Sequence, residues 1–191
     1  MEKATLKTLF CALALAAAMP AGAVDTYVID PTHTFARFSY LHLGLSHASG
    51  QFDKTSGTVT LDPANKSGSV DVTIDAKSVN TGVEKFDDHL KSKDFFEVDK
   101  YPTITFKSDR LKFAGDKLES VTGNLTVHGV TKPVTLKVTH FACKDHPMKK
   151  VPACGANATA TIKRSEFGVG GSVPYVGDET TLSIQIEAHK Q

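Results

Sequence analysis

The chain has 191 residues, of which 40% are hydrophobic and 23% are charged, and its formal net charge is +1. This near balance shows none of the basic excess typical of proteins that bind nucleic acid or anionic membranes, and it argues against a polyanionic ligand. Because the chain has no tryptophan, an apolar pocket must be built from Phe, Tyr, Leu, Ile and Val.

Residues 1–23 have the three parts of a cleavable secretory signal. Lys3 and Lys7 provide a basic start, residues 9–18 are apolar, and residues 21–23 form a small-residue cleavage site. The apolar run is well short of the ~20 residues that span a bilayer, and no later run is long enough. We therefore predict an exported protein whose mature chain, residues 24–191, folds as one domain.

Alternation with a period of two recurs through the mature chain and predicts β-strands. In residues 69–76 apolar side chains alternate with Ser, Asp and Thr, and residues 134–139 and 182–188 repeat the pattern. Strands with one solvent-exposed face and one buried face are typical of antiparallel sheets, since parallel strands are buried on both faces and are continuously apolar. Turn signals such as residues 62–68 and 168–171 separate about eight strands. This spacing fits a closed barrel or a sandwich.

Residues 83–96 are the one stretch with helical spacing. Val83, Phe86 and Leu90 fall near one face of a helix. Tyr101-Pro102 follows, and the residue before a proline is pushed out of the helical region. Alternation then returns at residues 103–107. We predict an all-β fold with this segment as a short helix over or beside one opening of the barrel.

Cys143 and Cys154 are the two cysteines of the mature chain. In an exported protein, a pair this close in sequence favours a disulfide over a metal site. Such a bond should stabilise the fold by roughly 3 kcal/mol. The alternative, a redox-active pair, lacks Cys-x-x-Cys spacing. We predict a Cys143–Cys154 disulfide around a proline-containing loop.

The eight histidines invite a metal or catalytic hypothesis, but their spacing does not support one. No His-Glu-x-x-His or paired ligand pattern occurs, so we predict no metal site and no cofactor. A Ser/His/Asp triad needs only proximity in space, yet the chain has no Gly-x-Ser-x-Gly elbow and no phosphate-binding loop. We therefore predict no catalytic residues and no enzyme activity.

Two histidines are candidate polar groups at the mouth of a barrel. His42 shares one face of a predicted strand with Phe38 and Tyr40. His89 lies on the predicted helix, after two aspartates. The alternative for each is a structural role, such as a hydrogen bond to a backbone carbonyl.

Several ordered segments carry a resemblance to a known family. They are residues 30–34 (DPTHT), 42–46 (HLGLS), 50–52 (GQF), 89–96 (HLKSKDFF), 100–102 (KYP), 129–134 (GVTKPV) and 167–168 (FG). Together they resemble the YceI-like family of periplasmic polyisoprenoid-binding proteins. The resemblance implies an eight-stranded antiparallel lipocalin-like barrel whose cavity holds a long isoprenoid, such as a quinone tail or a polyprenyl phosphate. It also implies a periplasmic location and a homodimer.

By that resemblance the apolar strand faces become the walls of a cavity. The candidate lining residues are Phe38, Tyr40, Val72, Ile74, Phe86, Leu90, Ile104 and Phe106. Period two identifies which side chains share a face but not which face points inward, and an ordinary core uses the same side chains. The competing classes are an enzyme of isoprenoid or lipid metabolism, which needs a metal or an activated nucleophile, and a stress-response protein with a filled barrel.

Overall fold

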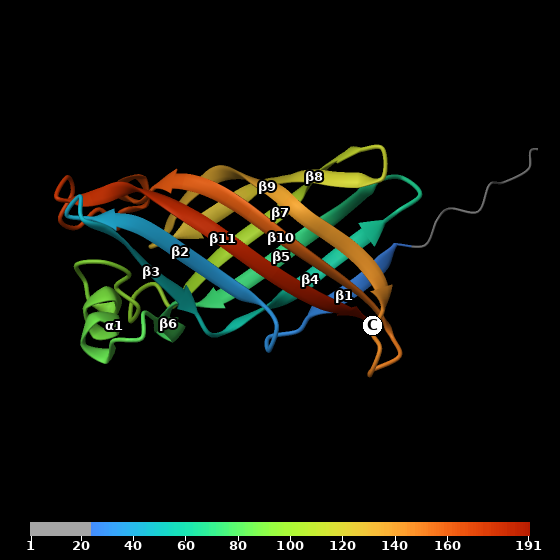
Figure 1. The fold of residues 1–191 in the computed structure, drawn as a ribbon, viewed down its shortest axis with the longest axis horizontal. Helices are drawn as coiled ribbons and strands as arrows, with labels where there is room; N and C mark the ends of the chain where they lie inside the picture. Colours follow the sequence, from blue (N-terminus) through green and yellow to red (C-terminus); the bar gives the residue numbers. More distant parts are fainter. Residues whose placement is uncertain (1–23) are drawn as a thin grey trace, which may run out of the picture.

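A computed structural model describes residues 24–191, and the predicted signal peptide lies outside the described residues. One α-helix, α1 (Glu84–Lys91), and two 3-10 turns, η1 (Ala76–Ser78) and η2 (Arg164–Phe167), accompany the strands in this part of the chain (Figure 1). The strands are β1 (Asp25–Ile29), β2 (Phe35–His42), β3 (Ser46–Phe52), β4 (Thr55–Asp62), β5 (Ser67–Asp75), β6 (Val79–Asn80), β7 (Thr103–Ala114), β8 (Lys117–Val127), β9 (Val130–Asp145), β10 (Pro152–Lys163) and β11 (Val176–Lys190).

The barrel closes through the first and last strands. Neighbours follow the order β1-β4-β5-β7-β8-β9-β10-β11, and β11 pairs again with β1, so a ring of 8 antiparallel strands results. Strands β2, β3 and β6 continue the sheet beyond this ring. β2 pairs with the N-terminal part of β11 as far as Gln185, β3 pairs with β2, and β6 pairs with β3. The predicted eight-stranded antiparallel barrel is confirmed.

A bend at residues 30–34 lets β1 and β2 pair with different ends of β11. The Asp30 carboxylate accepts hydrogen bonds from the backbone N–H and the hydroxyl of Thr32, at 2.9 and 2.6 Å, which is an Asx turn. Thr34 is buried, and its hydroxyl accepts from the N–H of Glu187 at 3.1 Å. These bonds hold the bend against β11.

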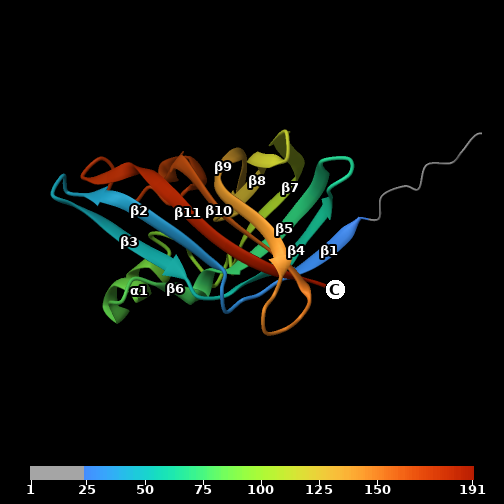
Figure 2. The same ribbon diagram turned by 45° about the vertical axis from the view of Figure 1, so that its right-hand side comes forward.

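Helix α1 lies beside one end of the barrel, next to β3 and β6, at the end away from the C-terminus (Figures 1 and 2). The prediction of helix as far as Phe96 is wrong at its C-terminal end. Ser92 is extended, and both its N–H and its hydroxyl donate to the carbonyl of His89, so the chain turns away. No helix within residues 24–191 is long and apolar enough to cross a membrane.

The predicted disulfide between Cys143 and Cys154 is confirmed, and it joins directly opposite residues of β9 and β10. Cys154 belongs to a small buried cluster with Tyr27, Leu61 and Ala188, which we call the closed-end cluster. Each of its members is at most 9% exposed, so side chains fill the barrel interior where the C-terminus emerges (Figure 1).

Candidate functional site

An apolar cavity of about 390 Å³ lies inside the barrel. Its wall is formed by side chains from every strand of the ring except β1, from β2 and β3, from α1 and the turns that follow it, and from η2 and the loop after it. All of the apolar residues predicted from the sequence line it, namely Phe38, Tyr40, Val72, Ile74, Phe86, Leu90, Ile104 and Phe106.

Strand register explains why these side chains meet. Val72 lies opposite Phe106, and Ile74 lies opposite Ile104, across the β5–β7 pair. Directly opposite residues share a face of the sheet, so one inward side chain sets the orientation of its neighbour. The apolar faces that period two identifies are thus the faces turned toward the interior.

Aromatic rings connect the β2–β3 wall with the segment after α1. The ring of Phe52 lies 5.8 Å from that of Phe38 and 5.5 Å from that of Phe96, between ring centres. Phe95 also lines the cavity, and its ring meets that of His89 edge to face at 4.9 Å. Because the helix stops at Lys91, the turns after it place Phe95 and Phe96 on the cavity wall.

The cavity has its mouth at the α1 end. Of the lining residues, His42, His89 and Ser172 are exposed, and all three lie at this end. Both candidate histidines are therefore at the mouth. Two exposed apolar tips flank it, with Leu45 at 83% and Tyr175 at 77% exposure. At the opposite end the closed-end cluster fills the interior.

A buried cation lies just inside the mouth. Arg164 is 7% exposed, and its guanidinium donates to the carbonyl oxygens of Val169 (2.7 Å), Gly171 (2.9 Å), Val176 (2.9 Å) and Gly177 (2.8 Å). These bonds hold the loop between η2 and β11. Burial lowers the pKa of Arg164 from its ordinary value, but a guanidinium stays charged in proteins.

Sequence reasoning missed Arg164, although a signal for it exists. Ala158 and Ile162 alternate on the inward face of β10, and Arg164 continues the same parity past the end of the strand. Thr180 was missed in the same way, because it continues the inward parity of Leu182 on β11. A polar residue at a position whose neighbours in the alternation are apolar and inward is the sequence signal for a polar group inside the cavity.

Comparison with known proteins identifies the family. The family described as the YceI-like domain matches residues 27–188, nearly all of the described chain. The chain belongs to the YceI-like family. A UPF0312 protein of Pseudomonas aeruginosa is 40% identical over 194 residues and covers 100% of this chain and 100% of its own.

Solved structures share the fold of this YceI-like chain. BcnA of Burkholderia cenocepacia is 30% identical with a TM-score of 0.72, covering 84% of this chain and 99% of its own. A polyisoprenoid-binding domain from Saccharophagus degradans has a TM-score of 0.65 at 17% identity, covering 86% of this chain and 98% of its own. The resemblance that the sequence motifs indicate is thus confirmed.

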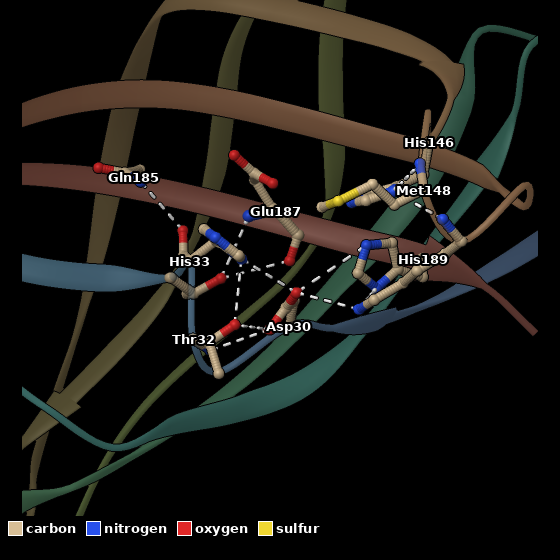
Figure 3. Close-up of polar contacts among 10 residues, drawn as sticks. Asp30, Thr32, His33, His146, Met148, Gln185, Glu187 and His189 are labelled. Atoms are coloured by element: carbon tan, nitrogen blue, oxygen red, sulfur yellow. Dashed lines mark hydrogen bonds and ion pairs between the residues drawn. The ribbon is translucent and has the colours of Figure 1, made fainter.

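The YceI-like chain has a second polar centre at the closed end, around Asp30 (Figure 3). This carboxylate is 7% exposed and accepts from Thr32, as described above. It also lies 3.1 Å from Nδ1 of His33, 3.3 Å from Nζ of Lys149 and 3.9 Å from Nε2 of His189. The hydrogen bonds of Thr32, with those of His33 and Lys149, hold the pKa of Asp30 well below its usual range. The carboxylate is therefore ionised at neutral pH.

These contacts anchor the disulfide loop to the barrel. Nδ1 of His146 accepts from the backbone N–H groups of Met148 and Lys149, at 3.2 and 3.1 Å (Figure 3). The turn so formed carries Lys149 to Asp30. Within residues 24–191 no group of three or more His, Cys, Asp or Glu side chains is placed to hold a metal ion. The histidines here fix a loop.

Proposed function

We propose that this protein is a periplasmic carrier that holds a long-chain isoprenoid lipid, of the quinone or polyprenyl phosphate class, in its barrel cavity. The main observation behind this proposal is the apolar cavity, whose exposed lining residues all lie at one end. The family membership supports the proposal, as does the fold shared with a domain named for polyisoprenoid binding. We propose residues 24–191 as its one domain, released from a signal peptide of residues 1–23.

The chemistry of the wall suits a prenyl chain. Burying apolar surface gains about 0.8 kcal/mol per CH₂ group, so a long chain binds through shape and apolarity without many polar contacts. Such a carrier needs no catalytic group, and the proposal is of a binding protein rather than an enzyme. The disulfide agrees with an oxidising compartment outside the cytoplasm.

The test compares lipid binding by delipidated wild-type protein with binding by a variant in which a larger side chain blocks the cavity. Ala158 is 8% exposed and lines the cavity from the middle of β10, so Ala158→Phe places a ring inside it. Thr161→Phe on the same strand is the matched control, because Thr161 is exposed on the outer face. We expect the wild type and Thr161→Phe to bind a prenyl quinone or polyprenyl phosphate, and Ala158→Phe to lose most of this binding while its circular dichroism is unchanged.

Folded wild-type protein that binds neither lipid would refute the carrier proposal and favour a filled barrel. Native mass spectrometry of the same samples reports any co-purified lipid and also tests the homodimer that the family resemblance implies. Fractionation of cells tests the periplasmic location.

A further inference from the structure

A row of inward side chains crosses three strands just inside the mouth. Thr180 on β11 lies directly opposite Ile162 on β10 and directly opposite Tyr40 on β2. All three line the cavity. Since opposite residues share a face, the Thr180 hydroxyl lies between Ile162 and Tyr40 on the cavity wall.

The hydroxyl of Thr180 is buried without a partner. The residue is 6% exposed, and its Oγ1 has no hydrogen-bond partner in residues 24–191. An unpaired buried hydroxyl costs about 1–3 kcal/mol, so a ligand atom that bonds to it recovers that cost. Tyr40 beside it is 8% exposed, and burial raises the pKa of its phenol, which therefore stays protonated and able to donate.

Arg164 adds a positive charge to the same place. Its guanidinium carbon lies 6.0 Å from the centre of the Tyr40 ring. Its four hydrogen bonds all go to backbone carbonyls, and no carboxylate of residues 24–191 lies within ion-pair distance of it. Asp178 interacts electrostatically with this charge but forms no ion pair with it. A buried charge without a direct ion-pair partner attracts an electron-rich group, and this attraction is strong where water is excluded.

We propose that Tyr40, Thr180 and Arg164 form a head-group subsite at the mouth, which binds the acceptor oxygens of the isoprenoid's head group. The inference rests on the proposed function and deepens it. A phosphate or a quinone supplies such oxygens. The prenyl tail then extends along the apolar wall toward the closed-end cluster, so the lipid enters tail first.

The experiment compares ligands that share the branched carbon skeleton of the tail and differ in the head. The probes are geranylgeranyl phosphate, a menaquinone with a geranylgeranyl tail, and phytane as a hydrocarbon without a head group. The variants are Thr180→Val and Tyr40→Phe, which remove a hydroxyl and keep the side-chain shape. Arg164 is not the residue to change, because it holds the loop before β11.

Thr55→Val is the matched control. Thr55 also lines the cavity, is 4% exposed and has an Oγ1 without a partner in the described chain, but it lies opposite Ile74 on another part of the wall. Thr55→Val therefore also removes a buried, unpaired hydroxyl, but at a place that the proposed head group does not reach.

We expect each test variant to weaken binding of the headed lipid by about fivefold to tenfold, as expected for one hydrogen bond, and to leave phytane binding unchanged. Thr55→Val should change neither. The head-group class is whichever of the phosphate and the quinone shows this selective loss. If neither headed lipid does so, or if phytane weakens equally, the subsite is wrong although the carrier function stands. If wild-type protein binds none of the probes, the carrier function itself fails.

Discussion

Replacing both cysteines by alanine tests how much the disulfide loop contributes to the barrel. The double variant Cys143→Ala/Cys154→Ala removes the cross-link without leaving a free thiol. The bonded cysteines are 11 positions apart, and closing a loop of that size removes unfolded-chain entropy worth about 3 kcal/mol at 25 °C. For a protein of this size 1 kcal/mol corresponds to roughly 2–4 °C in Tm, so we expect Tm to fall by about 6–12 °C.

The assay is urea and thermal unfolding followed by circular dichroism. Wild-type protein treated with reductant should match the double variant, and reductant should not affect the variant itself. Lipid binding should be unchanged at temperatures where both proteins are folded, because Cys154 packs in the closed-end cluster, at the opposite end from the mouth. A loss of stability below about 1 kcal/mol, or a reduced wild type as stable as the oxidised one, would refute the loop-entropy reasoning.

Three further changes probe the scaffold. Because its partners lower the pKa of Asp30, ionised Asp30 stabilises the fold above its usual pKa of about 3.9, and this stabilisation is lost as the pH falls below that value. Asp30→Asn should therefore lower the free energy of unfolding by about 2 kcal/mol at neutral pH and reduce the loss of stability in acid, as measured by urea titrations. A variant whose stability falls in acid as steeply as that of the wild type would contradict the assignment. Gly57 has φ +144°, and a Cβ there would clash with the backbone carbonyl oxygen of Asp71. Gly57→Ala should therefore destabilise the protein by more than about 1 kcal/mol in the same assay. Leu90→Ala should cost about 2–3 kcal/mol by loosening α1 from the interior, with an outcome near zero arguing against that packing.

Much of the cavity wall could be predicted because a barrel strand has one face toward the interior. For Val72, Ile74, Ile104 and Phe106 the apolar face of the alternation is the inward face, so the period identified which residues share a face and their apolarity identified the inward one. The end of the helix was harder to predict. Spacing at Phe86 and Leu90 is helical, but the bonds from Ser92 to the last turn end the helix, which a search for apolar periodicity does not consider.

The residues of the proposed head-group subsite could not be predicted as a group, because long-range pairing brings them together. Tyr40 and Thr180 are distant in sequence and become neighbours only through the register of β2 and β11. Arg164 joins them from the end of β10, after the strand has ended. The pairing of β11 with both β1 and β2 likewise depends on the bend after Asp30, which brings two strands close in sequence against one distant strand.

A cavity filled at one end by Tyr27 and its neighbours has a consequence for exchange kinetics. Among residues 24–191 the exposed lining side chains lie at the opposite end, so the proposed lipid would arrive and depart past His42 and His89. The resident molecule must leave before another enters, so a competitor cannot displace it from behind. For the proposed lipid carrier, exchange should therefore proceed at the dissociation rate, however much free competitor is present, and the residence time should set how often one protein molecule can deliver a lipid.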